Sequence, residues 1–408
     1  MPSSPYQIIV FGATSFVGQI LCRYLWQRHG AEGEVKWAMA GRSRAKLEQV
    51  RQQLGEGASA VPLIVADAAD EAALRTLCEQ TRVVISTVGP YALYGSPLVK
   101  VCAETGTDYC DLTGEVPWMA QMIAAHEATA KQTGARIVHT CGFDSVPSDL
   151  GVQFLQDAAY RQFNEPCTTI HMRIAKLRGG LSGGTVASML NMMREMEKDP
   201  SVKRVLTNPF VLTPEGRGVR QDDVKFVAYD SEAESWLAPF VMASINTRVV
   251  HRTNALIGAR YGKEFRYDEA MMTGRGVAGQ LRAVGMASGL AGFLVASSFR
   301  PTRNLLERHV VPKPGEGPSP QSQERGCYDL RFRGATAKGQ KLVAKVTGDR
   351  DPGYGSTAKM LGEAGTCLAL DIPKAEFAGG FWTPAALMGE RLRKRLIEHA
   401  GLTFDVIT

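Results

Sequence analysis

The sequence lacks the patterns that define metal sites and secreted proteins. Its eight cysteines include no CxxC pair and its seven histidines form no HxxxH or HExxH motif, so we expect no structural or catalytic metal. The first residues, MPSSPYQ, carry no signal peptide, which predicts a reduced, cytoplasmic protein. The chain also has no large excess of positive or negative charge. The net charge is only +6, which argues against nucleic acid and is compatible with an anionic cofactor or a phospholipid surface.

A run of strongly apolar residues long enough to span a membrane is also absent. Residues 283–299, AVGMASGLAGFLVASSF, hold no charge between Arg282 and Arg300. This segment is shorter than the roughly 20 strongly apolar residues that a span needs, and glycine, alanine and serine dilute it. We therefore expect a buried or interfacial helix, which leaves open a peripheral position at the inner face of the plasma membrane.

The strongest motif is a glycine turn between a buried strand and a helix, in residues 6–25. The apolar run 7–11 is typical of a parallel strand buried on both faces. The turn that follows has the spacing Gly12-x-x-Ser15-x-x-Gly18, a variant of the dinucleotide fingerprint with serine at the middle position. Ser15 either limits the approach of a phosphate or donates its hydroxyl to one. The alternative is a tight turn that binds nothing.

The end of the second expected strand, 35–40, indicates which dinucleotide binds. An NAD site would place an acid there for the ribose 2′-hydroxyl, and this chain has Gly41-Arg42-Ser43-Arg44 instead. A guanidinium and a hydroxyl suit a 2′-phosphate, so NADP(H) is favoured over NAD(H). The alternative, a solvated surface charge, fits Arg44 better than Arg42.

Strands and helices alternate through the first third of the chain, which predicts a doubly wound parallel sheet. Asp67 ends the third strand and either neighbours the adenine or caps the helix that starts near Glu71. Gly89 and Pro90 follow the fourth strand, at the point where an open sheet binds its ligand. The expected cofactor-binding residues are Gly12, Thr14, Ser15, Phe16, Val17, Gly18, Arg42, Ser43, Asp67, Val88, Gly89 and Pro90.

The pattern changes near residue 150, where longer connections separate expected strands at 168–175, 224–229, 265–271, 327–333 and 341–347. A stripe of methionines, Met189, Met192, Met193 and Met196, precedes most of these strands. It is more typical of an adaptable core than of a loose apolar pocket. We predict a dinucleotide-binding domain in 1–148, an inserted α+β substrate domain in 149–375, and a C-terminal segment, 376–408, that returns to the first domain.

Seven motifs spread over nearly the whole chain resemble one family. They are GATSFVG (12–18), AGRS (40–43), GPYALYG (89–95), YCDLTGE (109–115), CGFDSVPSDLG (141–151), PKPGEGPS (312–319) and GGFWTPAALMGERL (379–392). The sequence is similar to the saccharopine-dehydrogenase-like oxidoreductases, in particular to the trans-acting enoyl reductases of bacterial lipid and polyketide synthesis. This resemblance implies a Rossmann fold, NADP-type cofactor binding and reduction of a carbon–carbon double bond in an acyl or polyketide chain. A carrier or a membrane surface would deliver that substrate. The sequence is compatible with a homodimer and does not decide the oligomeric state.

Reduction of an enoyl thioester needs a hydride at the β-carbon, an electrophile at the thioester oxygen and a proton for the α-carbon. Tyr91 and Tyr94 follow the fourth strand and are candidates to supply a phenol near the nicotinamide, with pocket lining as the alternative. Asp144 is the third catalytic candidate. For Asp144, as for Asp111, the alternative is capping of a loop or helix start.

Two other functions compete with enoyl reduction. A saccharopine-type imine or amino-acid dehydrogenase would need arginines that bind carboxylates, and Arg248 and Arg252 are the tight pair in the second domain. A non-catalytic, membrane-associated protein would keep the nucleotide fold for structure and use residues 283–299 to contact lipid.

Overall fold

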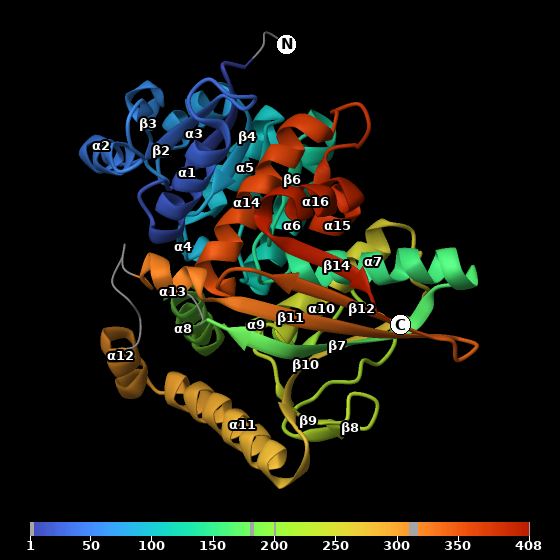
Figure 1. Cartoon of the computed structure of the whole chain (residues 1–408). Helices are drawn as coiled ribbons and strands as arrows, with labels where there is room; N and C mark the ends of the chain where they lie inside the picture. The colour runs from blue at the N-terminus through green and yellow to red at the C-terminus, as the bar shows by residue number, and fades with distance from the viewer. Residues whose placement is uncertain (1–3, 180–182, 200, 310–316, 408) are drawn as a thin grey trace.

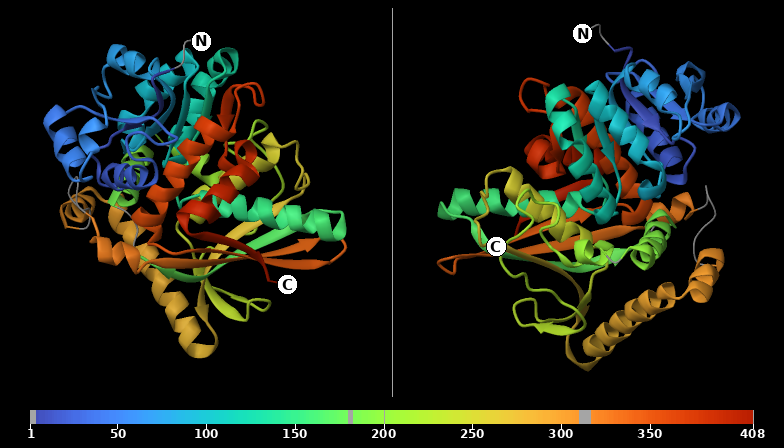
Figure 2. Two further views of the ribbon diagram at one scale, coloured as in Figure 1. Left: turned by 45° about the horizontal axis from the view of Figure 1, so that its top comes forward. Right: turned by 180° about the vertical axis from the view of Figure 1, so that it is seen from behind.

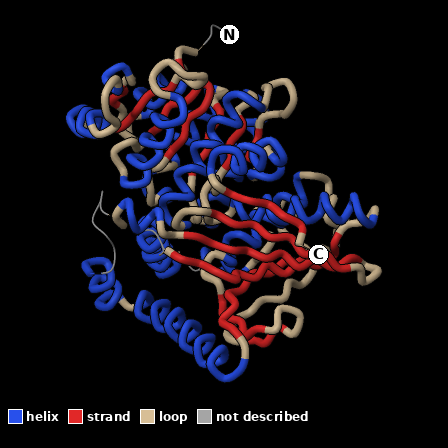
Figure 3. The backbone as a smooth tube through the Cα atoms, viewed as in Figure 1, coloured by secondary structure: helices blue, strands red, loops and turns tan. Residues whose placement is uncertain are grey.

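The computed structural model describes residues 4–179, 183–199, 201–309 and 317–407. Two seven-stranded sheets organise these residues, one near each end of the molecule as drawn in Figures 1 and 3. The predicted α/β fold, with a parallel N-terminal sheet and a second α+β part, is confirmed.

The first sheet is entirely parallel and has the order β13-β6-β5-β4-β1-β2-β3. Its strands are β1 (Tyr6–Phe11), β2 (Trp37–Gly41), β3 (Leu63–Val65), β4 (Thr81–Ser86), β5 (Asp108–Asp111), β6 (Arg136–Val138) and β13 (Gly380–Trp382). The helices that connect them are α1 (Phe16–His29), α2 (Arg44–Gln52), α3 (Glu71–Cys78), α4 (Tyr91–Tyr94), α5 (Ser96–Thr105) and α6 (Val116–Thr133). The chain reverses direction across the sheet between β1 and β4, and a ligand crevice therefore opens at their carboxyl ends.

The second sheet is mixed and has the order β14-β12-β11-β7-β10-β9-β8. Its strands are β7 (Cys167–Arg178), β8 (Ala228–Asp230), β9 (Ser235–Pro239), β10 (Arg266–Gly274), β11 (Cys327–Thr336), β12 (Lys341–Gly348) and β14 (Leu402–Val406). Near it lie α7 (Val146–Phe163), α8 (Gly183–Lys198), α9 (Ser201–Thr207), α10 (Ala243–Leu256) and α13 (Pro320–Glu324). Two further helices, α15 (Pro384–Leu387) and α16 (Gly389–Arg395), pack on α7. The sequence did not predict β9 or β14, which are only five residues long each.

The path of the C-terminal part differs from the expected division at residue 375. A short π-helical turn, η2 (Pro352–Ser356), leads into α14 (Thr357–Thr366), and α14 already packs on α1, β4 and β5 of the first domain. Two more such turns, η3 (Cys367–Asp371) and η4 (Leu396–Ala400), follow, and β14 then pairs with β12 of the second sheet. Since α14 is buried on all sides, it has no polar face by which its boundary could be recognised in the sequence.

Helix α11 (Gly276–Ser298) projects from the body of the molecule, followed by α12 (Arg300–His309) (Figures 1 and 2). Of the two expected states, buried or interfacial, the buried one is wrong, because only a narrow face of small residues such as Ala283 and Ala287 packs on the body. Val277 and Leu281 are 73% and 67% exposed. Among the described residues, α11 is the helix that is long and apolar enough to cross a membrane, judged by length and composition alone.

Candidate functional site

Both glycines of the N-terminal turn occupy positions that admit no side chain. Gly12 has φ +91°, and a Cβ there would lie 2.7 Å from the Val88 side chain. A Cβ on Gly18 would lie 2.2 Å from the carbonyl oxygen of Gly12, because α1 begins directly against the turn. The turn therefore forms a cradle of bare backbone at the N-terminus of α1, which suits the pyrophosphate of a dinucleotide.

Ser15 has a role that the sequence did not predict. It is the N-cap of α1, where its hydroxyl accepts a hydrogen bond from Gly18 N at 2.9 Å. The same hydroxyl shares a hydrogen bond with Thr87 Oγ1 at 2.9 Å, which ties the turn to the end of β4. The middle residue of the motif thus replaces the usual glycine with a cap that satisfies one free N–H of the helix.

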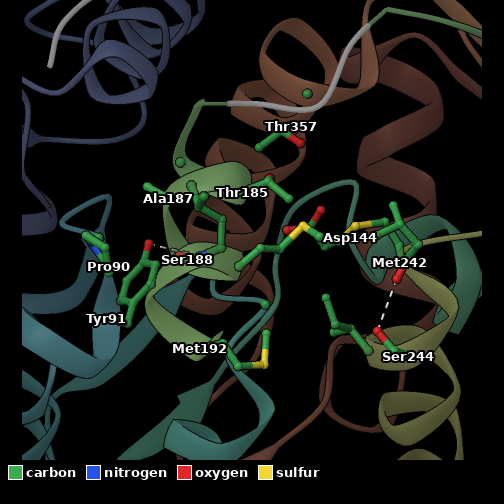
Figure 4. A pocket seen from close by; sticks show the side chains of 18 of the residues that line it. Pro90, Tyr91, Asp144, Thr185, Ala187, Ser188, Met192, Met242, Ser244 and Thr357 are labelled. Atoms are coloured by element: carbon green, nitrogen blue, oxygen red, sulfur yellow. Dashed lines mark hydrogen bonds between the residues drawn. The ribbon is translucent and has the colours of Figure 1, made fainter. Parts of the chain in front are cut away.

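A single cavity of about 1700 Å³ extends from this turn to α8, α10 and α11. Figure 4 shows part of its wall, with Pro90 and Tyr91 from the first domain, Ser188 and Met192 from α8, and Ser244 from α10. Of the expected cofactor-binding residues, Gly12, Thr14, Ser15, Phe16, Val17, Arg42, Ser43, Asp67, Val88, Gly89 and Pro90 line the cavity, and Gly18 does not. Gly18 stands behind the turn and permits its close approach to the helix.

The two arginines after β2 are separated by the fold. Arg42 is exposed and lines the cavity, whereas Arg44 forms an ion pair with Glu48 at 3.1 Å outside its lining. Ser43 caps α2 and accepts from Lys46 N at 3.4 Å. Lys46, which also lines the cavity, is a candidate that sequence reasoning missed. Its position four residues after Arg42, in the first turn of a helix, was the available signal.

This arrangement predicts that Arg42→Ala weakens NADPH binding and leaves NADH binding nearly unchanged. Loss of a hydrogen bond to a charged 2′-phosphate costs about 1 to 3 kcal/mol, and NADH has no such phosphate. Arg44→Ala is the matched control and should change neither affinity. Fluorescence titration of the three proteins with each nucleotide measures the effect. Equal weakening of both nucleotides by Arg42→Ala would remove Arg42 from the 2′-phosphate site.

Asp67 lies at the cavity, and it does not cap α3. Its carboxylate accepts from Ala69 N at 3.0 Å within the loop. The cap of α3 is Asp70, which accepts from Ala72 N and Ala73 N. The capping alternative for Asp67 is therefore wrong, and its place beside the adenine stays a prediction.

Tyr91 and Tyr94 differ in how their hydroxyls are placed. Tyr91 is 4% exposed, and its hydroxyl donates to Ser86 O at 3.0 Å and accepts from Leu112 N at 3.4 Å. Burial raises the pKa of the Tyr91 hydroxyl well above its ordinary value. Both partners are backbone groups, so this hydroxyl holds β4 and the loop after β5 together. Tyr94 is 49% exposed and lines the cavity.

Glu115 fastens the loop after β4, and no sequence signal set it apart from other loop carboxylates. Its carboxylate accepts from Tyr91 N at 2.8 Å and Ala92 N at 3.0 Å, at the start of α4. The Ser188 hydroxyl of α8 donates to the same carboxylate at 2.8 Å. Burial raises the pKa of Glu115. This one buried group therefore joins the cofactor side of the cavity to α8.

The contacts of Asp111 support the alternative that it caps its loop. Its buried carboxylate accepts from Thr113 N at 3.0 Å, from Thr140 N at 3.1 Å and from the Tyr109 hydroxyl at 2.9 Å, and it contacts His139 Nδ1 at 2.7 Å. All of these partners are protein groups, so Asp111 stabilises the carboxyl edge of the sheet.

Asp144 lies in a different environment from Asp111. Its side chain is only partly exposed and lines the cavity, and within the described residues no hydrogen bond reaches its carboxyl group. Burial raises the pKa of Asp144 to about 7. A half-buried carboxyl group without hydrogen bonds to its charged form therefore keeps its proton in part of the molecules at neutral pH. The capping alternative for Asp144 thus finds no support in its contacts.

The methionine stripe of α8 lines the cavity, so its interpretation as core is wrong. Met189, Met192, Met193 and Met196 are half-buried and face the same space as Leu290 and Leu294 of α11. Unbranched, polarizable methionine side chains adapt to apolar ligands of varied shape. This end of the cavity is therefore suited to a flexible apolar chain.

Arg248 and Arg252 do not form a carboxylate site. Arg252 donates to Phe381 O at 2.5 Å and to Leu212 O, and it does not line the cavity. Arg248 lines the cavity, but it donates to Ser244 O at 2.6 Å and to Leu206 O. Backbone carbonyls thus engage both guanidiniums, which argues against the paired acid recognition that an amino-acid dehydrogenase needs.

Comparison with known proteins defines the class of this fold and site. The saccharopine dehydrogenase NADP binding domain matches residues 8–138, the segment from β1 to β6. The whole fold resembles saccharopine dehydrogenase (L-Glu forming) from Saccharomyces cerevisiae, with a TM-score of 0.51, 12% identity and coverage of 99% of this chain and 100% of that chain. The molecule is an NADPH-dependent oxidoreductase with the saccharopine dehydrogenase fold, as the resemblance implied.

The curated relatives define the family within this class. A trans-acting enoyl reductase of Mycobacterium ulcerans (strain Agy99) is 39% identical over 96% of this chain and 95% of its own length. A trans-acting enoyl reductase of Mycobacterium tuberculosis (strain ATCC 25618 / H37Rv) is 38% identical over the same shares. This chain belongs to the trans-acting enoyl reductase family.

Proposed function

We propose that the protein reduces the α,β carbon–carbon double bond of a long 2-enoyl thioester, an intermediate of acyl or polyketide synthesis. One observation carries the proposal. A single cavity joins the dinucleotide cradle at Gly12, the half-buried carboxyl group of Asp144 and the apolar wall at Met192. Enoyl reduction requires these three elements: a cofactor site, a proton source and room for an acyl chain.

The cofactor site is assigned to the turn and to the end of β2. The bare backbone at Gly12 and the free N–H groups of α1 bind the pyrophosphate, and Arg42 with Lys46 binds the 2′-phosphate. NADPH, when bound, supplies a hydride for the β-carbon of the substrate. Glu115 and Tyr91 act as positioning residues, because their buried hydrogen bonds hold the loop at Gly89 and Pro90 against the cavity.

The proton for the α-carbon comes from Asp144 in this proposal. Below about pH 7 its carboxyl group is neutral, so its O–H donates a proton and the carboxylate that remains is protonated again from solvent. Tyr94 is placed as a lining residue with a phenol available to the thioester oxygen. A carrier protein or a membrane surface presents the acyl chain to the methionine wall of α8.

The test is a series of 2-enoyl thioesters of increasing length. Each methylene buried along α8 yields about 0.8 kcal/mol, so kcat/KM should rise about fourfold per methylene until the cavity ends. Met192→Gln should flatten this rise, because it places an amide on the apolar wall. Met286→Gln is the matched control, since Met286 lies on α11 outside the cavity lining. Reduction of NADP+ with saccharopine, together with no NADPH consumption with any enoyl chain, would overturn the proposal.

A further inference from the structure

Helix α11 presents an apolar surface that the nucleotide site does not explain. Its outward residues recur every three or four positions and lie on one side of the helix. They are Val277 (73% exposed), Leu281 (67%), Val284 (39%) and Val295 (60%), with Ser288 and Ala291 between them. Phe299, 61% exposed, follows at the end of the helix. We call these residues the α11 stripe.

Charge on α11 has one sign only. The helix contains no Asp or Glu, and Arg282 is its single charged side chain. Within the described residues, Arg282 has no carboxylate partner, and its guanidinium reaches only Thr273 O at 3.5 Å. The positions beside the stripe include Gly285, Gly289 and Gly292. When two helices pair in a soluble protein, charged residues beside the seam keep its flanks hydrated. At these flanking positions α11 has no charged residue.

Both ends of α11 are tied to the same body, so the helix cannot cross a bilayer. At its start, Gly274 N donates to Ser235 Oγ at 3.0 Å, next to β9. After its end, the buried Arg303 pairs with Glu197 of α8 at 2.9 Å. With 23 residues, α11 is about 35 Å long. It therefore presents its whole outward side to one plane.

The inner side of the same helix reaches the cavity. Leu290 and Leu294 line the cavity beside the methionines of α8, while Val295 points outward at the next position. Apolar surface thus continues from the stripe around the helix to the cavity wall. A lipid phase is the partner that covers an uncharged helix on its entire outward side and attracts a lone cation.

We propose that the α11 stripe lies in the interfacial layer of an anionic phospholipid bilayer, with the helix parallel to the membrane plane. Arg282 is then placed among the lipid phosphates, and the stripe enters the boundary between headgroups and acyl chains. This docking surface does not depend on enoyl reduction, because lipid binding is measured without turnover.

The test is flotation of the full-length protein with vesicles of phosphatidylcholine and phosphatidylglycerol, compared with vesicles of phosphatidylcholine alone. The double variant Leu281→Glu/Val295→Glu should bind the anionic vesicles at least about tenfold more weakly, because it places two carboxylates in the apolar layer. The matched control is Val65→Glu/Ile397→Glu, which changes residues 51% and 47% exposed outside α11. Arg282→Gln should weaken binding about fivefold, the factor for about 1 kcal/mol per cation.

Unchanged NADPH titration shows that each variant is folded. Equal flotation of wild type and the α11 double variant would overturn the proposal, as would absence of wild-type flotation. Analytical ultracentrifugation without lipid tests the other possible partner, a second copy of the chain. A wild-type dimer that the double variant dissociates would assign the stripe to a second copy of the chain and would also overturn the proposal.

Discussion

Asp144→Asn should lower kcat for enoyl reduction by about 100- to 10,000-fold and leave NADPH affinity unchanged. The amide keeps the shape of the side chain and cannot donate an acidic proton to the α-carbon. Stopped-flow measurement of NADPH oxidation gives the rate, and fluorescence titration gives the affinity. Asp223→Asn is the matched control, because Asp223 also lines the cavity but is exposed to solvent.

The pH dependence separates a proton donor from a structural carboxylate. Burial raises the pKa of Asp144 to about 7, so the active, protonated form predominates below that pH. In the wild type kcat should therefore fall as pH rises through about 7, and the residual rate of Asp144→Asn should show no such fall. A wild-type profile that is flat from pH 6 to pH 8, or a fully active Asn variant, would remove Asp144 from the chemistry.

The dinucleotide half of the molecule could be predicted from sequence because its signals are local. A buried strand, a glycine turn and an amphipathic helix follow one another within residues 6–29, and this unit then alternates along the chain. The preference for NADP(H) could be inferred in the same way, because Arg42 stands at the end of β2 where an NAD site would have an acid. Local patterns of this kind specify an element without knowledge of its tertiary partners.

The roles inside the site depended on contacts between distant segments. Ser15 caps its own helix and also reaches Thr87 across the sheet, 72 positions later. Glu115 joins α4 to Ser188 of α8. The hydroxyl of Tyr91 points into the protein, toward the backbone of β4. None of these partners follows from spacing, so sequence reasoning left the Tyr91 phenol as a candidate for chemistry or for pocket lining and overlooked the Glu115 carboxylate.

The surroundings of the two apolar helices, α8 and α11, also could not be predicted from the sequence. A methionine stripe has the same helical period whether it faces a core or a cavity, and α8 faces a cavity. The uncharged segment 283–299 predicts a buried or interfacial helix, and α11 is exposed because the body offers it only a narrow strip at Ala283 and Ala287. Periodicity identifies the apolar face of a helix, whereas the tertiary structure decides what covers that face.

Gly18→Val should weaken NADPH binding by about 100-fold and lower the melting temperature. A Cβ at this position lies 2.2 Å from Gly12 O and 2.9 Å from Ser15 Oγ, so α1 must move away from the turn. Such overpacking costs about 1 to 3 kcal/mol of stability. Loss of two hydrogen bonds to charged phosphate oxygens, at about 1.5 kcal/mol each, weakens binding by about 100-fold.

Two variants show whether this effect belongs to the cradle. Gly289→Val also places valine on a helical glycine, but a Cβ at Gly289 meets no atom within 4 Å, so NADPH affinity should not change. Ser15→Gly removes the N-cap hydroxyl at a cost of only a few tenths of a kcal/mol, because glycine is itself a tolerated cap. Thermal unfolding and NADPH titration of the three variants measure both effects. If Ser15→Gly abolished binding while the protein stayed folded, the Ser15 hydroxyl would be a phosphate ligand in addition to a cap. If Gly18→Val bound NADPH as well as the wild type does, the cofactor would not lie on this turn.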